Sequence, residues 1–515
     1  MLTLSLALLL AADPAPVRCD LVLKGGTIYD GSGEPGRAGD VAIQGDKVVA
    51  VGTFTVAGSP KSVDCAGLVV APGFIDLHTH SDSPLQAAAT RANLSYAFQG
   101  VTTEVTGNCG SGPTDVARYF GTLERGGIGC NVIHQVPHNN VRSEVMGNVN
   151  RPPTADELER MKKLVDQGMR DGAYGMATGL IYNPGTYSKT DELIALAKVA
   201  AAHGGHYASH IREEGNGLLD AIQEAITIGR EAKLPVHISH IKVTGARNWG
   251  KSADAIRLIE SARAAGQIVT ADQYPYPASS TSLRAMVVPA RFREGSNAEF
   301  RKRLDDSEQG PALRQAIEQM IGGRNGGKSL RIASYRQKPA WQGKDLAAIA
   351  ESEGKPVVEV VLEIERKGGA GVVSFGMSEE DVRLYMKQPW VATASDGGSK
   401  VPDSTVPHPR SYGTFPRKIG RYSIEEKVIP LEQAVRSSSG LPADILRLKD
   451  RGYLKVGQFA DVVVFDPKTF RDTATYDQPH QYATGVRLLL VNGKAVIEDG
   501  KATKALPGRV LRHKP

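Results

Sequence analysis

Residues 73–82 read GFIDLHTHSD, a short apolar run that ends in two histidines, His78 and His80. Side chains alternate along a strand, so residues two positions apart point to the same side. The residues LVVAPGFID predict a strand that is entered through a Pro-Gly turn. At the carboxyl end of a strand in a parallel barrel, where such barrels carry their functional groups, two imidazoles can bind one divalent metal. A His-x-His pair is common by chance, so its context decides.

That context is a long alternation of strand-like apolar runs and helical stretches, from about residue 73 to about residue 438. Such alternation is typical of repeated strand–helix units around a parallel sheet. We therefore predict a (β/α)8, TIM-like barrel over residues 73–438. The eight strand candidates are GFIDLHTH, VTTEVTGN, CNVIHQVP, YGMATGL, GGHYASHI, PVHISHIK, IVTADQYPY and WVATASDG.

The barrel rhythm breaks between about residues 282 and 347, where the chain becomes charged and mostly helical. We predict an insertion after the seventh strand, which is either a lid or an enlarged surface loop without a catalytic part. Both ends of the chain, residues 19–72 and 439–515, predict short strands separated by glycine turns. We expect these two ends to form one small β-sandwich domain.

The first residues, MLTLSLALLLAA, are apolar but too few to span a bilayer, and they stand where a secretory signal would stand. No lysine or arginine precedes the apolar stretch, and only Ala11-Ala12 suggests a cleavage site. We predict a removed signal peptide over residues 1–18, a secreted or periplasmic protein and no stable membrane insertion afterwards. Without cleavage the protein would be cytoplasmic.

The overall charge argues against one kind of partner, and the cysteine count argues against a disulfide-stabilised fold. Basic residues number 62 and acidic residues 56, which gives a net charge of +6 without a basic run, so we expect no nucleic-acid partner. Small anionic substrates agree with this excess, as does a solvated surface. Four cysteines are too few for a disulfide framework in 515 residues. For Cys65 and Cys130 we predict the ordinary place of a free cysteine in a core.

Three further strand ends carry side chains that bind metals. VTTEVTGNCGSG delivers Cys109 into a glycine-rich turn, while HYASHIREEG and VHISHIKVTG end in His210 and His240, thirty positions apart. That interval fits one strand–helix repeat. Zinc accepts both sulfur and nitrogen, so this set suits zinc better than magnesium or calcium. His206 and His237 stand earlier in the same strands, where core or hydrogen-bonding roles are expected.

The eighth strand candidate, WVATASDGGS, ends in Asp396. An inward carboxylate beside a metal can take a proton from attacking water and return it to a leaving nitrogen. A Ser-Asp-Gly sequence is a common turn, and only its position after the other segments, in order, makes Asp396 the candidate catalytic base.

The ordered pieces, from His-Thr-His through Asn-Cys-Gly and two Ser-His pairs to Ser-Asp-Gly, resemble the N-acyl-D-amino-acid deacylase (D-aminoacylase) family of the amidohydrolase superfamily. The resemblance covers nearly the whole chain after the leader. Commoner binuclear amidohydrolases carry a carboxylated lysine on strand four, whereas YGMATGLIYNPG has no lysine. The resemblance implies that Cys109, His210 and His240 hold a tight Zn²⁺. It implies that His78, His80 and Asp396 face a second, weaker metal position.

The resemblance also implies a clamp for the free carboxylate of an acylated amino acid. The matching residues are Lys242, Tyr274 or its neighbour Tyr276, Ser280 and Arg410. Arginine suits this role because its fork binds a carboxylate through two hydrogen bonds. Surface charge is the alternative interpretation of Lys242 and Arg410.

The implied activity is the zinc-dependent hydrolysis of N-acyl-D-amino acids to a carboxylate and a free D-amino acid. A dipeptidase of L-D type would need the same scissile bond and clamp, so it remains open. The absent lysine and the Asn-Cys-Gly segment disfavour a cyclic amidase. A barrel that binds ligands without catalysis is disfavoured because every ligand and the candidate base Asp396 are present.

Overall fold

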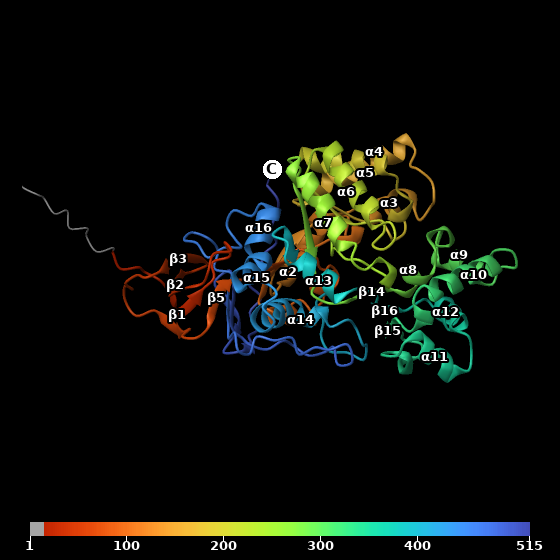
Figure 1. Cartoon of the computed structure of the whole chain (residues 1–515). Coiled ribbons are helices and arrows are strands. Elements are labelled where there is room, and N and C mark those ends of the chain that lie inside the picture. The colour runs from red at the N-terminus through yellow and green to blue at the C-terminus, as the bar shows by residue number, and fades with distance from the viewer. Residues whose placement is uncertain (1–14, 515) are drawn as a thin grey trace, which may run out of the picture.

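The computed structural model describes residues 15–514 and has a closed barrel of parallel strands at its centre (Figure 1). Two hydrogen-bonded segments of sheet make up the wall, with the orders β6-β7-β8 and β9-β10-β11-β12-β13-β17, and β9 continues the third strand directly after β8. The barrel closes between its last and first strands through two backbone hydrogen bonds. The amide of Asp396 donates to the carbonyl of His78 (2.8 Å), and the amide of His80 donates to the carbonyl of Gly397 (2.6 Å). The predicted (β/α)8 barrel is confirmed.

The barrel strands are β6 (Phe74–Asp76), β7 (Val101–Thr106), β8 (Asn131–His134), β9 (Val136–Pro137), β10 (Gly175–Gly179), β11 (His206–His210), β12 (Val236–Ile238), β13 (Val269–Gln273) and β17 (Val391–Thr393). The helices between and after them are α1 (Leu94–Ala97), α2 (Val116–Gly126), α3 (His138–Met146), α4 (Ala155–Arg170), α5 (Thr190–Ala202), α6 (Leu218–Ala232), α7 (Ser252–Ala264), α13 (Glu379–Met386), α14 (Arg410–Pro416), α15 (Leu431–Ser438) and α16 (Gly440–Leu446).

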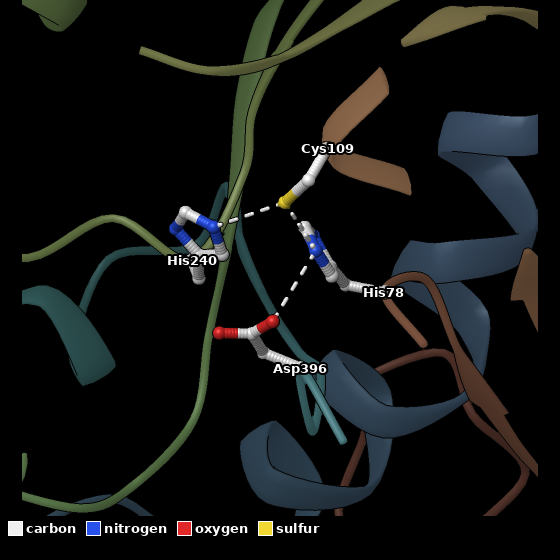
Figure 2. A group of neighbouring side chains, drawn as sticks. All are labelled: His78, Cys109, His240 and Asp396. Carbon is white, nitrogen blue, oxygen red and sulfur yellow. Dashed lines mark hydrogen bonds and ion pairs between the residues drawn. The ribbon is translucent and has the colours of Figure 1, made fainter. Parts of the chain in front are cut away.

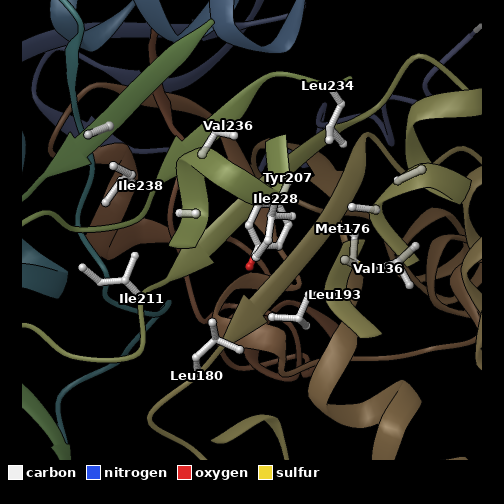
Figure 3. Close-up of a cluster of buried hydrophobic side chains, with 14 of the residues drawn as sticks. Val136, Met176, Leu180, Leu193, Tyr207, Ile211, Ile228, Leu234, Val236 and Ile238 are labelled. Carbon is white, nitrogen blue, oxygen red and sulfur yellow. The ribbon is translucent and has the colours of Figure 1, made fainter. Parts of the chain in front are cut away.

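Apolar side chains between the barrel strands and their covering helices form the largest core. Figure 3 shows Met176, Tyr207 and Val236 from the strands beside Leu193 and Ile228 from α5 and α6, and all five are buried. Burying one such side chain contributes about 1.5–3 kcal/mol. Every residue of strands β7, β10, β11 and β13 is buried, since a parallel sheet is covered on its outer face and filled inside.

The small β domain is one nine-stranded sheet built from both ends of the chain. Strand β5 lies between β1 and β18, so the two ends join there. Its strands are β1 (Leu21–Ile28), β2 (Arg37–Gln44), β3 (Lys47–Gly52), β4 (Lys61–Asp64), β5 (Val69–Pro72), β18 (Val462–Phe465), β19 (Val486–Val491), β20 (Lys494–Glu498) and β21 (Lys501–Ala502). Val463 and Phe465 pack toward Phe74 at the barrel, whereas Val462 and Val464 fill a core within the domain.

A module inserted after β13 lies on the opposite side of the barrel from the small β domain (Figure 1). Its three-stranded sheet has the order β14-β16-β15, and it has an apolar core of its own. The predicted range 282–347 is too short, because β14 pairs with β16 and so closes the module only at residue 375. Its elements are β14 (Ala278–Ser282), α8 (Leu283–Val287), η5 (Ala290–Phe292), α9 (Asn297–Leu304), α10 (Gln309–Gly322), β15 (Leu330–Ser334), α11 (Leu346–Glu353), α12 (Val357–Arg366) and β16 (Gly371–Phe375). We call residues 278–375 the inserted module.

The predicted signal peptide lies largely outside the described residues, which begin at residue 15. Val17, inside the range assigned to the leader, pairs with Val56 in a β-bridge. Its amide donates to the carbonyl of Thr55 (2.8 Å), and its carbonyl accepts from the amide of Ala57 (2.9 Å). Within residues 15–514, no helix combines the length and the apolar character needed to cross a bilayer.

Candidate metal centre

Five side chains from different strands meet at the carboxyl end of the barrel. The Sγ atom of Cys109 lies 3.3 Å from Nε2 of His78 and 3.5 Å from both Nδ1 of His210 and Nε2 of His240. Figure 2 shows four of the five groups. The Oδ1 atom of Asp396 lies 3.5 Å from Nε2 of His78. Each residue ends or follows a barrel strand, so the closed sheet places residues that are up to 318 positions apart within one small volume.

Three of these residues adopt backbone conformations that side-chain-bearing residues seldom take. The φ angles of Cys109, His240 and Asp396 are 52°, 36° and 53°. Left-handed conformations cost on the order of 1 kcal/mol or more each, and they persist where the surrounding structure enforces them, often at functional sites. Here each one turns a side chain from the end of a strand toward the barrel axis.

The end of β10 leaves no room for a side chain beside the loop that carries Cys109. A β-carbon on Gly179 would lie only 2.3 Å from the carbonyl oxygen of Cys109. A side chain at this position would therefore displace the loop that carries Cys109. The cysteine loop and a side chain at the end of strand four exclude each other in this barrel.

The charges of the cluster favour metal binding. Burial lowers the pKa of His78 to about 4 and also lowers that of His210, so both imidazoles are neutral and keep a free lone pair. Burial raises the pKa of the Cys109 thiol, and a cation held at Sγ would reverse that shift. Nε2 of His210 and Nδ1 of His78 are buried without a hydrogen-bond partner. A buried set of one sulfur, three nitrogens and one carboxylate fits zinc.

Asp396 and His80 lie at the edge of this cluster. One oxygen of Asp396 is 3.1 Å from Nε2 of the half-exposed His80, and the other accepts a hydrogen bond of 2.6 Å from Arg410. Burial alone would raise the pKa of Asp396, but the ion pair with Arg410 and the neighbouring histidines hold it well below the usual range. Asp396 is therefore ionised and able to accept a proton.

Two carboxylates behind the cluster were not predicted from the sequence. Asp272, on β13, accepts hydrogen bonds from the amide of His240 (2.7 Å) and from Nε2 of His237 (2.8 Å), and it lies 3.5 Å from Nδ1 of His78. Carboxylates that bind the outer nitrogen of a ligand histidine orient the ring and increase its basicity. An acidic residue inside an otherwise buried barrel strand was the available signal.

The second of these carboxylates is Glu214, four positions after His210. Its Oε1 lies 3.3 Å from Nδ1 of His240, 3.7 Å from Nε2 of His210 and 2.6 Å from Nζ of Lys242. Glu214 thus connects both ligand histidines to Lys242. In the sequence it is one half of a Glu-Glu pair, which is typical of a solvated turn, so nothing local distinguishes it.

A cavity of about 660 Å³ opens onto the metal centre and contains most of the predicted carboxylate clamp. Lys242, Tyr274 and Ser280 line it together with His210 and Asp396. The hydroxyl of Tyr274 is buried without a hydrogen-bond partner, so it is available to a ligand. Lys242 and Ser280 already have protein partners, since the lysine contacts Glu214 and the Ser280 hydroxyl donates to the carbonyl of Val372 (2.9 Å).

The fourth predicted clamp residue, Arg410, lies behind Asp396 and not in the cavity wall. Its guanidinium donates to Asp396 and to the carbonyl of Ser280 (3.2 Å). Tyr276 is buried beside Arg417 outside the cavity, which favours Tyr274 for the clamp. Contact of Arg410 with a substrate stays a prediction, whereas its contact with the candidate base is direct.

The remaining histidines and cysteines have ordinary structural partners. His206 contacts Gln135, and His237 lies between Thr270 and Asp272, as expected for residues earlier in their strands. Cys65 and Cys130 are buried, and neither belongs to the donor cluster.

A closed parallel barrel with these donors at its strand ends has the architecture of a metal-dependent hydrolase. Residues 61–497 match the profile of the Amidohydrolase family. The chain belongs to this family.

Similarity to individual family members extends over nearly the full length. The chain is 37% identical to a D-aminoacylase of Alcaligenes xylosoxydans xylosoxydans, over 96% of this chain and 97% of the relative. A crystal structure of D-aminoacylase superimposes with a TM-score of 0.84 at 36% identity, covering 96% and 100% of the two chains. The N-acyl-D-glutamate deacylase of Bordetella bronchiseptica, solved with zinc and a phosphonate mimic of the tetrahedral intermediate, gives 0.83 at 32% identity, also over 96% and 100%. The resemblance predicted from the sequence is confirmed.

Proposed function

We propose that this enzyme hydrolyses the amide bond of N-acyl-D-amino acids with the help of zinc, releasing a carboxylate and a free D-amino acid. The observation that carries the proposal is the convergence of Cys109, His78, His210 and His240 on one point beside the ionised Asp396. The near-full-length similarity to D-aminoacylase and to a zinc-containing N-acyl-D-glutamate deacylase supports the substrate class and the metal.

The residues around the cavity divide the chemical work. Zinc held by Cys109, His210 and His240 would act as a Lewis acid that makes water nucleophilic near neutral pH. Asp396 accepts the proton of the attacking water at its carboxylate and donates it to the departing amine nitrogen. The free hydroxyl of Tyr274 is placed to donate a hydrogen bond to the oxyanion or to the substrate carboxylate. Lys242 supplies the positive charge that attracts this carboxylate.

The test is amine release by the zinc-loaded protein from matched N-acetyl-D- and N-acetyl-L-amino acids, with L-D dipeptides and a cyclic amide alongside. We expect release from the acetyl-D compounds and its loss on chelation. Preferential cleavage of the dipeptides would identify the enzyme as a dipeptidase and not a deacylase. Opening of the cyclic amide would identify it as a cyclic amidase. Retained zinc without any turnover would contradict the proposal.

We also propose that the protein is secreted or periplasmic, because its first twelve residues have the apolar character of a signal peptide. N-terminal sequencing of the protein recovered from the extracytoplasmic fraction checks this. An intact Met1 on protein confined to the cytoplasm would contradict it.

A further inference from the structure

His408 is a buried histidine that the proposed catalytic scheme does not use. Its Nε2 atom donates a hydrogen bond to the carbonyl of Ala278 (3.0 Å), and its Nδ1 atom accepts one from the backbone amide of Arg410 (3.0 Å). A carbonyl can only accept and a backbone amide can only donate, so these partners require the neutral ring with its proton on Nε2. Burial and the neighbouring Arg410 hold the pKa of His408 well below its usual range, which keeps the ring neutral. His408 therefore joins two segments through a pair of contacts that a charged imidazole could not make together.

The two segments joined by His408 carry side chains of the catalytic cavity and its base. Ala278 begins β14, and Ser280, two positions later, lines the cavity. Arg410 begins α14, and its guanidinium donates to Asp396 (2.6 Å) and to the carbonyl of Ser280 (3.2 Å). Carbonyls two residues apart in a strand point to the same edge, so His408 and Arg410 hold one edge of β14 while β16 pairs with the other.

The ring of His408 also packs against the ring of Tyr274, which lines the cavity. These two rings lie edge to face with their centroids 6.0 Å apart, and Tyr276 and Tyr476 are also edge to face with the imidazole, at 4.9 and 5.2 Å. His408 itself is not part of the cavity wall. Its influence on the cavity would therefore pass through Tyr274, β14 and Arg410.

Hydrogen bonding by His408 has a structural consequence and a positional one. An apolar side chain in its place would leave a buried carbonyl and a buried amide without this partner, which is costly for stability. The amide that His408 binds, however, belongs to Arg410 itself. This amide is the first of the helix and has no partner within it, so the bond from His408 fixes where α14 begins and where its first side chain starts. Loss of the bond would release the arginine from the candidate base.

We propose that His408 is a positioning residue for amide hydrolysis. Its Nδ1 contact keeps the guanidinium of Arg410 on Asp396, and its Nε2 contact keeps Ser280 and Tyr274 in the cavity wall. The first contact thus serves the turnover step, and the second serves substrate binding. This inference rests on the proposed deacylase function, which gives Asp396 and the carboxylate clamp their roles.

Two amide variants separate the contacts of His408. The side-chain oxygen in His408→Asn reaches the place of Nδ1 and can accept from the amide of Arg410, whereas the longer side chain in His408→Gln places an N–H near Nε2 and can donate to Ala278. We expect His408→Asn to keep kcat and to raise KM by about 10-fold, and His408→Gln to keep KM and to lower kcat by about 10-fold. Steady-state kinetics of the zinc-loaded variants with an N-acetyl-D-amino acid measures both constants. Equal effects of the two variants, or the reverse division, would overturn the inference, because a side chain that only supports folding would not divide kcat from KM.

A double-mutant cycle tests whether the effect on kcat passes through Arg410. We expect His408→Gln to lower kcat by about 10-fold in the native background and by less than about 3-fold in Arg410→Gln, where the residue that it positions is already absent. Equal factors in the two backgrounds would overturn the inference. His480→Gln is the matched control and should change kcat by less than about 2-fold. Both ring nitrogens of His480 are also hydrogen-bonded, but to the hydroxyl of Tyr412 and the carbonyl of Thr405, which lie outside β14.

Crystal structures of the two amide variants test the same positions without turnover. The guanidinium of Arg410 should stay on Asp396 in His408→Asn and should leave it in His408→Gln. An unmoved Arg410 in both variants would overturn the inference even if the enzyme is a deacylase. The expected displacement, together with no cleavage of any acetyl-D compound by the native protein, would support the positioning contact and refute the deacylase.

Discussion

The rim of the barrel and the inserted module enclose one cavity, but they treat charge in opposite ways. At the rim, Asp396 is paired with Arg410 and Lys242 with Glu214, and His78 and His210 are neutral. In the inserted module, Arg293 and Arg324 form no ion pair with any residue of the described range 15–514, although Glu213 acts on Arg324 from a greater distance. The donors of the rim would balance the charge of a bound cation, whereas no described acidic side chain forms an ion pair with the two arginines of the module. The candidate base and the metal donors therefore lie in the barrel, and the cavity-lining arginines without an ion pair lie in the inserted module.

The largest effect should come from the candidate base. We expect Asp396→Asn to retain zinc and to lose at least about 10³-fold in kcat, because the amide cannot accept the proton of the attacking water. Zinc analysis together with steady-state kinetics measures both quantities. The exposed Asp477→Asn serves as the control. Near-normal turnover in Asp396→Asn would remove its role as base.

The next effect concerns the sulfur ligand. Cys109→Ala should lower zinc affinity by about 100-fold or more and abolish turnover at limiting zinc, since it removes the donor nearest three histidines. Cys65→Ala removes a buried sulfur in the small β domain and should leave zinc binding unchanged. Competition with a chromogenic chelator measures the affinity, and equal affinities in the two variants would place the metal elsewhere.

A smaller loss is expected from the carboxylate behind the ligands. Glu214→Gln should weaken zinc binding by about 10- to 100-fold because it loosens His210 and His240. Glu213→Gln, at the next position, contacts neither histidine and should bind zinc normally. If both variants behave alike, the orientation of the ligands does not depend on Glu214.

The smallest effect is on stability and concerns a barrel histidine outside the donor cluster. Burial lowers the pKa of His206 to about 3, so the folded state prefers its neutral form. The contribution of neutral His206 to the free energy of unfolding is fully present above about pH 6.5. It decreases by about 1 kcal/mol for each pH unit as the pH falls toward 3. His206→Gln should therefore lose less stability between pH 7 and pH 5 in urea unfolding. An unchanged pH dependence would contradict the assignment.

The barrel and its donors were predictable because their signals are local. Each strand is a short apolar run, and each ligand stands at the end of one, so sequence order alone placed His78, Cys109, His210, His240 and Asp396 at one rim. The extent of the inserted module was not predictable in this way. Its boundary depends on the antiparallel pairing of Ser280 with Val373, which are far apart in the sequence.

The partners of the charged side chains were also not predictable from the sequence. Arg410 was assigned to a substrate carboxylate, but its nearest carboxylate is that of Asp396, a contact between residues fourteen positions apart that a turn and a helix start bring together. Arg293 and Arg324 occur in a segment rich in charge, where surface arginines are ordinary. Only the three-dimensional arrangement identifies which arginines have a partner.

X-ray absorption at the zinc edge tests whether one metal centre unites the cysteine of the second strand with the histidines of the first, fifth and sixth strands. We expect one sulfur at about 2.3 Å and nitrogen or oxygen neighbours at about 2.0–2.1 Å, with the sulfur signal lost in Cys109→Ala. A spectrum of the native protein with nitrogen and oxygen neighbours alone would contradict it.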